Sequence, residues 1–415
     1  MKSVSYAASG LALTLGMLAA MAPAAEAQIG AQASQPAPAR QFRLTKQERA
    51  ALAPLQVALA AKDAAGAAAA LPAAQAGATS ADARFILARL QFQLALDTRN
   101  AALQSQAIDA LIASGPTAAE LPRLLQNQAA LATFAGNRQR AESALTRLIE
   151  IEPNNAEALK DLARIKIDQR KPAEAVPLLD RSISLSRAAG QRVPESWYEY
   201  NLRLATDLKL PVASKLGRDL AAAYPSAENW RDAILTYVDV ARPTTASMLD
   251  AWRLMRATKS LAGERDYLAL AEAADGAGLP AEAKVVLDEG VSRKMVDPTK
   301  SVFKELLVGS AKRAAAERAG LAGRQAAGLA PTATGVAALT AADASFGQAD
   351  YPKAAALYRA AIQKGGIDTG SAGTRLGMAL GLAGQRAEAE TALQAVAGPS
   401  ADLAQLWLVW FRQPA

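Results

Sequence analysis

The sequence predicts an all-α fold, an α-α superhelical solenoid of helical hairpins, on three observations. The chain of 415 residues is 51% hydrophobic but only 5% aromatic, and alanine at this density suits closely packed helices with strong intrinsic propensity. Apolar residues recur at helical spacing, as in Phe85, Ala88 and Phe92, whereas strand-like alternation is nowhere sustained. The third observation is a repeat of about 34 residues, which predicts stacked units rather than one globular core.

The repeat is clearest in the middle of the chain. Small and large residues return in the same order about 34 positions later, with Ala129, Ala141 and Leu145 matched by Ala163, Ala175 and Leu179. The small residues allow the two helices of a hairpin to approach closely, and the large ones fill the space between neighbouring hairpins. Because one hairpin cannot bury its own apolar face, the units must stack and the terminal units need caps.

Weaker units continue toward the C-terminus in the order turn residue, small residue, large residue. They comprise Gly278, Ala283 and Leu287; Asp350, Ala354 and Tyr358; and Gly384, Ala389 and Leu393. In this register the chain resembles a degenerate tetratricopeptide repeat, a helix-turn-helix unit of about 34 residues, over most of residues 46–397. Leu376-Gly377 and Trp197 stand where that family prefers Leu-Gly and Trp. The resemblance implies a non-enzymatic scaffold whose ligands lie along the concave surface formed by the first helix of each hairpin.

The N-terminus is typical of an exported bacterial protein. Residues 1–27 begin with Lys2, continue through an apolar stretch and end in the small-x-small site Ala25-Glu26-Ala27, which predicts a cleavable signal peptide. An uncleaved membrane anchor is the alternative, disfavoured because the apolar stretch is short and interrupted. The chain has no Cys, so we do not expect a lipoprotein. We expect a periplasmic protein without a transmembrane span after processing.

The remaining chain divides by composition. Residues 28–45 are rich in Gln, Ala and Pro and predict a flexible leader. A repeat array is predicted over 46–320, a Gly/Ala/Pro-rich hinge over 321–335, and C-terminal repeats with a capping helix over 336–415. The large aromatic residues of that last helix are Trp407, Trp410 and Phe411. We expect them to pack against the final hairpin, and docking on a partner is the alternative.

Composition also excludes most enzyme classes. The chain has no His and no Cys, so it lacks the usual metal ligands, the Ser-His and Cys-His nucleophile systems and the commonest general base. We therefore predict no catalytic residue, no metal and no cofactor. One enzymatic alternative is a resemblance to the murein lytic transglycosylases, in which a helical solenoid precedes a lysozyme-like domain with a catalytic Glu-Ser motif. Glu195-Ser196 supplies that dipeptide, but it stands at the start of a repeat helix.

The net charge is +7, and basic residues concentrate near residues 138–171 and 300–324. Acidic residues interleave in the first cluster, so a solvated face is favoured over a polyanion groove. Nucleic acid is not expected as a partner outside the cytoplasm. The candidate partner-binding residues are Glu157, Lys160, Arg164 and Tyr198. The repeat register places these side chains on the concave surface of two neighbouring hairpins.

These observations predict a scaffold for protein or peptide partners of the bacterial envelope. The alternative is an accessory component of polysaccharide export or cell-wall handling that binds glycan, including an anionic polysaccharide, or an outer-membrane pore. Glycan binding uses aromatic platforms, so exposure of Trp197, Tyr198 and Trp230 on the concave face would favour it.

Overall fold

The computed structural model describes residues 42–414, and all regular structure in this part of the chain is helical. The N-terminal helices are α1 (Lys46–Ala60), α2 (Ala64–Gly77), α3 (Ala81–Asp97), α4 (Ala101–Ala113), α5 (Leu121–Phe134), α6 (Arg138–Ile151), α7 (Ala156–Asp168), α8 (Pro172–Ala188), α9 (Glu195–Asp207) and α10 (Ala213–Ala223). They are followed by α11 (Ala227–Ala241), α12 (Thr245–Ala257), α13 (Glu264–Gly276), α14 (Pro280–Ser292), α15 (Ser301–Leu329), α16 (Gly335–Gly347), α17 (Tyr351–Lys364), α18 (Thr369–Leu382), α19 (Arg386–Gln394), the 3-10 turn η1 (Gly398–Ser400) and α20 (Ala401–Arg412). The predicted signal peptide and residues 28–41 of the predicted leader lie outside the described residues.

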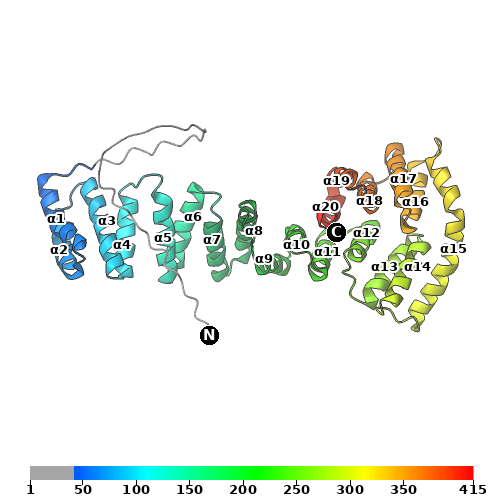
Figure 1. Ribbon diagram of the computed structural model, residues 1–415, viewed down its shortest axis with the longest axis horizontal. Helices are drawn as coiled ribbons and strands as arrows, with labels where there is room; N and C mark the ends of the chain where they lie inside the picture. The colour runs from blue at the N-terminus through cyan, green and yellow to red at the C-terminus, as the bar shows by residue number, and fades with distance from the viewer. Residues whose placement is uncertain (1–41, 415) are drawn as a thin grey trace, which may run out of the picture.

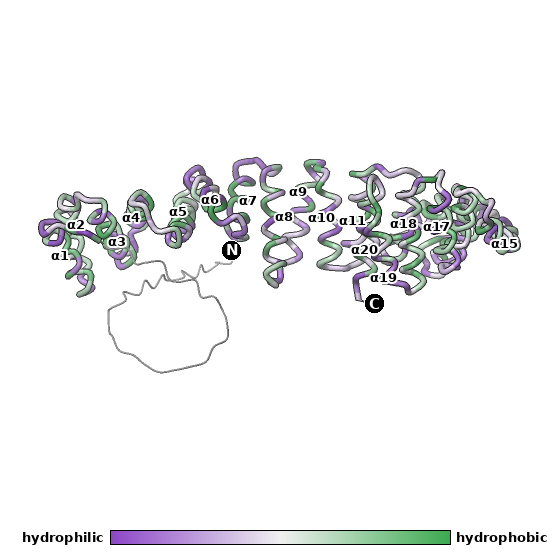
Figure 2. The backbone as a smooth tube through the Cα atoms, turned by 90° about the horizontal axis from the view of Figure 1, so that it is seen from above, coloured by the Kyte–Doolittle hydropathy of each residue, from purple (hydrophilic) through white to green (hydrophobic). Residues whose placement is uncertain are grey.

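Consecutive helices pack against each other along the whole described chain, which confirms the predicted all-α solenoid. Helices α1 to α8 form an extended row, whereas α11 to α20 curl into a ring (Figure 1). The predicted register holds in the core, because Ala141, Ala163 and Ala175 are fully buried. Seen from above, hydrophobic and hydrophilic segments alternate along the helices (Figure 2). Among the described residues, no helix has the length and apolar character that crossing a membrane requires.

The last residues of the predicted leader are part of the folded structure. The ring of Phe42 stacks on Phe85 with 5.3 Å between the ring centroids, and Thr45 caps α1 through a capping box with Glu48. The prediction of a flexible leader is therefore wrong for residues 42–45. Aromatic burial and the cap anchor this part of the chain to α3 and α1.

The hinge predicted over 321–335 is also wrong for most of its length. Helix α15 continues without a break to Leu329, and the non-helical connection spans only residues 330–334. Gly328 serves close packing, because a Cβ atom there would lie 3.0 Å from the side chains of both Ala341 and Leu357. Alanine favours the helix strongly enough to offset the glycines of this segment.

The C-terminal helix closes the ring. Helix α20 packs against α18 and α19 and also against α10, α11 and α12, which lie far from it in sequence. Trp407 and Phe411 are buried in this contact. The Trp230 indole donates to Gln413 Oε1 at 3.2 Å, and Gln413 Nε2 donates to the carbonyl of Ala221 at 2.9 Å. The prediction that these aromatic residues pack on the final hairpin is thus too narrow, because they join the two ends of the ring.

A buried network of charges lies inside the ring. Arg375 on α18 donates to Asp250 on α12 at 2.8 Å and to Asp343 on α16 at 2.9 Å. Arg253 on α12 donates to Asp250 and, through Nε, to Glu282 on α14, both at 2.8 Å. Burial raises the pKa of Asp343, opposed by the nearby guanidinium of Arg375. The network connects four helices that the sequence separates widely.

Arg375→Met should destabilise the ring. The substitution leaves Asp250 and Asp343 without one buried cationic partner, and breaking a buried pair in this way costs about 3–5 kcal/mol. Arg359→Met is the matched control, because Arg359 pairs with Glu388 at an exposed position, where an ion pair contributes about 0–1 kcal/mol. Urea unfolding followed by tryptophan fluorescence measures both values. Equal destabilisation by the two variants would contradict a stabilising role for the network.

A second charged group anchors the first hairpin. Glu48 is buried, and its carboxylate accepts hydrogen bonds from the amides of Thr45 at 2.9 Å and Ser80 at 2.8 Å and from the Thr79 hydroxyl at 3.0 Å. The bonds from the Thr45 and Ser80 amides, in that order, are the main reasons why the pKa of Glu48 falls from 4.5 to about 2. Glu48 therefore ties the start of α1 to the start of α3.

The first hairpin should accordingly lose stability in acid. A lowered carboxyl pKa contributes stability that is complete above the unfolded value of 4.5 and is lost as the pH falls toward about 2. Hydrogen exchange, corrected for intrinsic rates, should show α1 and the start of α3 losing protection in this range. Glu48→Gln should be less protected at neutral pH and nearly independent of pH. An unchanged pH response in that variant would assign the effect to another carboxylate.

Candidate partner-binding groove

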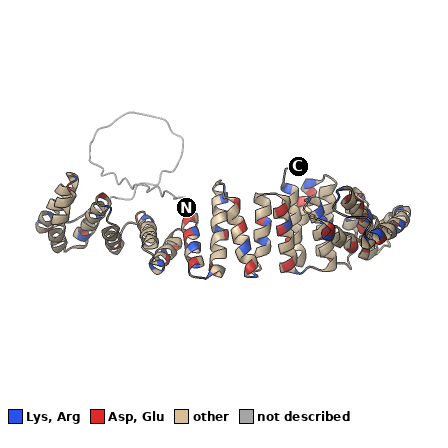
Figure 3. Cartoon of the chain, turned by 90° about the horizontal axis from the view of Figure 1, so that it is seen from below, with Lys and Arg blue, Asp and Glu red and all other residues tan. Residues whose placement is uncertain are grey.

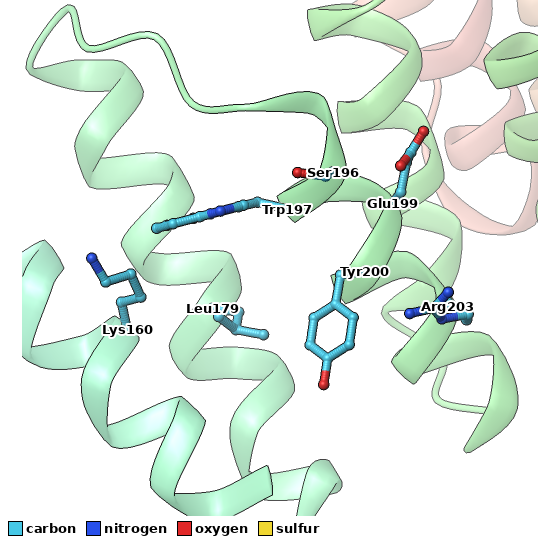
Figure 4. A pocket seen from close by; sticks show the side chains of 7 residues that line it. All are labelled: Lys160, Leu179, Ser196, Trp197, Glu199, Tyr200 and Arg203. Carbon is cyan, nitrogen blue, oxygen red and sulfur yellow. The ribbon is translucent and has the colours of Figure 1, made fainter. Parts of the chain in front are cut away.

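An open cavity of about 480 Å³ lies between α7, α8 and α9. Its lining residues are Lys160, Leu179, Ser196, Trp197, Glu199, Tyr200 and Arg203. Figure 4 shows the side chains of Trp197 and Lys160 directed toward the same space, with Leu179 and Tyr200 beside it. Because α7 and α9 are the first helices of neighbouring hairpins, the cavity opens between two consecutive repeats. We name it the α7–α9 groove.

Local sequence positions the helices that form the groove. Asn155 caps α7, its side chain accepting from the amide of Ala158 at 2.9 Å, and this cap sets the start of the helix that carries Lys160. Pro194 precedes α9 in extended conformation. Along α9, residues 197, 200 and 203 are three positions apart and share one face. The core stripe of the same helix consists of Tyr198, Leu202 and Ala205.

Cations lie against both aromatic rings of the groove. The ammonium of Lys160 is 5.2 Å from the ring centroid of Trp197 and also pairs with Glu157. The guanidinium of Arg203 is 5.4 Å from the ring centroid of Tyr200. Such contacts contribute about 0.5–1 kcal/mol at exposed sites. They hold the half-buried rings in place while their outer faces remain accessible.

The predicted site residues are only partly brought together. Lys160 lines the groove, and Glu157 stands beside it as its ion-pair partner. Arg164 is exposed next to Asp161, with 3.5 Å between guanidinium and carboxylate, and is not among the lining residues. Tyr198 is only 4% exposed, so its placement on the concave surface is wrong.

Tyr198 is buried because it belongs to the core stripe of α9. Its ring packs edge-on against Tyr224, with 5.9 Å between the centroids. Burial is the main reason why the pKa of Tyr198 is raised. The neighbours Trp197 and Tyr200 face the groove instead, together with Arg203. Tyr198, Leu202 and Ala205 follow helical spacing. This spacing could have shown from the sequence that Tyr198 lies on the buried face of α9 and not on the face of the groove.

The basic cluster around the groove is largely neutralised by its own acids. Lys166 lies 2.7 Å from Glu142 and 2.5 Å from Glu174, and Arg140 pairs with Asp109. Basic and acidic side chains are interspersed along this part of the chain (Figure 3). The hydrogen bond from Lys166 is the main cause of the lowered pKa of Glu142. The arrangement supports a solvated face rather than a polyanion groove.

Glu195, the candidate for enzymatic chemistry in the Glu195-Ser196 dipeptide, makes a contact between helices. Glu195 begins α9 and accepts a hydrogen bond from Asn229 at 2.6 Å, which ties α9 to α11. The described chain beyond Glu195 continues as packed helices that close into the ring. Between residues 42 and 414, His, Cys, Asp and Glu side chains form no group of three or more that could hold a metal ion.

Comparison with known proteins identifies the repeat. A family model described as tetratricopeptide repeat matches residues 135–185, which include α6, α7 and most of α8. No curated protein matches the chain. Similar solved structures include a tetratricopeptide repeat protein from Parabacteroides merdae, 16% identical, with a TM-score of 0.23, covering 63% of this chain and 99% of the other.

Two further solved structures show similar identities. A structure of Naa15/Naa10 bound to HypK-THB is 17% identical with a TM-score of 0.29, and the match covers 86% of this chain and 60% of the other. The P58(IPK) TPR domain is 13% identical with a TM-score of 0.25, and the match covers 81% of this chain and 98% of the other. The family match shows a tetratricopeptide repeat at residues 135–185, and the described chain on both sides of it continues as packed helices.

Proposed function

We propose that this protein is a non-enzymatic scaffold of the bacterial periplasm that holds a segment of an envelope protein in the α7–α9 groove. The observation that carries the proposal is the pair of half-buried rings, Trp197 and Tyr200, in an open cavity beside Lys160 and Arg203. Trp, Tyr and Arg are the residues that most often dominate binding energy at protein interfaces. Their rings are already held in position, so little ordering entropy is lost on binding.

The charges of the groove favour a partner segment that is apolar and acidic. Leu179 and the two rings offer an apolar floor, while Lys160 and Arg203 offer cationic groups on either side. Glu199 also lines the groove and disfavours a second acidic group at its own position. An apolar side chain between the rings, with a carboxylate toward Lys160 or Arg203, therefore fits best. A charge-assisted hydrogen bond there contributes about 1.5–3 kcal/mol.

The proposed location rests on the sequence. Residues 1–27 have the charge, apolar stretch and small-x-small site of a signal peptide, and the absence of Cys agrees with a fold stabilised by helix packing alone. N-terminal sequencing of the exported protein should begin at Gln28. A protein that starts at Met1 and remains in the membrane fraction would contradict this part of the proposal.

A protein partner is favoured over a glycan. Of the three rings whose exposure would favour glycan binding, Tyr198 and Trp230 are buried, and Trp230 serves the ring closure through Gln413. Only Trp197 is partly exposed, and the cation beside it suits an acidic segment. The aromatic platform that an extended sugar chain requires is therefore not formed by these three residues.

Site-directed photo-crosslinking should capture the partner from the groove. A benzophenone amino acid at Tyr200 places the reactive group beside the cavity, and we expect cross-linked envelope proteins that mass spectrometry can identify. Phe134, which is 85% exposed at the end of α5, is the control position. Capture of the same proteins with equal yield from both positions would show that the groove has no special role.

Substitutions should then separate the groove from its surroundings. Trp197→Ala, Arg203→Glu and Lys160→Glu should each weaken the captured partner by about tenfold, or about 1.4 kcal/mol, because these side chains line the cavity. Arg164→Glu and Arg138→Glu should leave the affinity within about twofold, because these residues lie outside it. Titration calorimetry with the purified partner measures the affinities. Equal losses for Lys160→Glu and Arg164→Glu would indicate a general charge effect instead of the groove.

A further inference from the structure

Four charged side chains lie at the α7–α9 groove, and they differ in how they are paired. Glu157 and Lys160, one turn apart on α7, form an ion pair with each other. Glu199 and Arg203 are one turn apart on α9, yet neither side chain makes an ion pair or a hydrogen bond with any described residue. The two cations of the groove are therefore not equivalent.

Arg203 is held by an aromatic ring and not by an acid. Its guanidinium lies 5.4 Å from the ring centroid of Tyr200, and Figure 4 shows the Glu199 side chain directed away from it. Residues four apart on a helix are close enough to pair, so the contact with Tyr200 takes the place of that pair. The N–H donors of a guanidinium form a planar fork that binds a carboxylate through two parallel hydrogen bonds. Arg203 keeps these donors free for a partner.

Lys160 is already paired within the protein. Its ammonium lies 5.2 Å from the ring centroid of Trp197 and pairs with the carboxylate of Glu157. The Lys160 side chain is only 28% exposed, whereas that of Glu157 is 58% exposed. A partner carboxylate at Lys160 would lie beside the more exposed carboxylate of Glu157 and be repelled by it. Lys160 thus orients the ring of Trp197 but is a poor site for an acid.

The remaining carboxylate limits the number of acids that the groove accepts. Glu199 lines the groove and is exposed on the same helix as Arg203, so it repels a second acid there. The two cations and two carboxylates have no net charge, and such a group exerts little long-range attraction on an acidic chain. A carboxylate therefore gains free energy only through direct contact with Arg203. This pattern suits a segment with one acid and disfavours a polyacidic tail.

We propose that the partner segment carries one acidic side chain beside its apolar anchor, that Arg203 determines specificity by binding this carboxylate, and that Glu157 excludes a second acid by occupying Lys160. The inference rests on the proposed function, because it names the chemistry of the segment held at Trp197 and Tyr200. Lys160→Glu still weakens such a segment, since it leaves two unpaired carboxylates beside the ring of Trp197.

Selection from a peptide library tests the charge pattern. The protein expressed from the full chain and purified after export selects binders from random short peptides displayed on phage, and Trp197→Ala removes those that bind elsewhere. The enriched peptides should carry one Asp or Glu beside an apolar residue. Glu157→Gln, which frees Lys160, should enrich peptides with two acids. Enrichment of peptides with several acids by the wild-type protein would overturn the proposal.

A double-mutant cycle identifies the side chain that binds the acid. Fluorescence anisotropy measures the affinity of one selected peptide, and of its variant with Asn or Gln in place of the acid, for wild type and Arg203→Gln. Each change alone should weaken binding about tenfold, and both together should weaken it no further. The same cycle with Lys160→Gln should give a coupling below about twofold. Coupling of the acid to Lys160 in place of Arg203 would contradict the proposal.

A peptide with a second acid tests the role of Glu157. Glu157→Gln should raise the affinity of the two-acid peptide about fivefold relative to that of the single-acid peptide, because Lys160 becomes available. Arg164→Gln is the matched control, since Arg164 is an exposed cation of α7 that pairs with Asp161 outside the groove, and it should leave this ratio unchanged. An unchanged ratio in Glu157→Gln would refute the exclusion of a second acid.

The outcomes distinguish this inference from the proposed function. Peptides that bind wild type and Trp197→Ala equally well would show that the groove holds no segment, and both proposals would then fail. Peptides that require Trp197 but have no acid, or whose acid couples to Lys160, would leave the proposed function in place and overturn this inference alone.

Discussion

The structure depends on one constraint, which is that a pair of amphipathic helices cannot cover its own apolar surface. Each hairpin exposes an apolar face on both sides, and burying apolar surface contributes about 25 cal/mol per Å². The chain meets the constraint by repetition, so that each hairpin covers the next. Fully buried alanines such as Ala141 and Ala175 allow the close approach, and leucines such as Leu145 fill the space between units.

The two ends of the array differ in how their outer apolar faces are covered. At the C-terminal end the array curls until α20 reaches α10, α11 and α12, and the apolar face of the last hairpin is buried by the chain itself. Buried Arg253 and Arg375 then hold α12, α14, α16 and α18 in one arrangement. Burying these charges costs desolvation free energy. The ion pairs that offset this cost join helices that come together only in the closed ring. At the N-terminal end the described residues form no corresponding closure, and Val57 on α1 is exposed.

The α7–α9 groove results from the packing of neighbouring repeats against each other. Helix α9 turns Tyr198, Leu202 and Ala205 into the core, and this leaves Trp197, Tyr200 and Arg203 on an outer face beside Lys160. The rings are large enough to be half-buried by the neighbouring repeat and still contact a ligand. Lys160 and Arg203 restrict the motion of the rings through cation–π contacts. The candidate binding surface therefore lies where two repeats meet, without any insertion into the fold.

Helical character and repeat register could be read from the sequence, because both depend on local spacing. The period that relates Ala141 to Ala175 acts through neighbouring turns and neighbouring hairpins, and the structure places both residues in the core. For the candidate site, the same register located Lys160 but selected Tyr198 in place of Trp197 and Tyr200. Adjacent residues differ by about 100° around a helix, and the rotation of α9 is set by packing against α8 and α10.

Contacts between residues far apart in the chain could not be predicted from the sequence. Helix α15 continues to Leu329 although the composition of its last turns is typical of a hinge, and Gly328 packs there against Ala341 and Leu357. Ring closure depends on Gln413 meeting Trp230 and Ala221, and on Arg375 meeting Asp250. Small angular differences between successive repeats add up along the array. The sequence by itself therefore determined that the units are helical and stack, whereas only the tertiary structure decided how far the stack curves and that its C-terminal half closes.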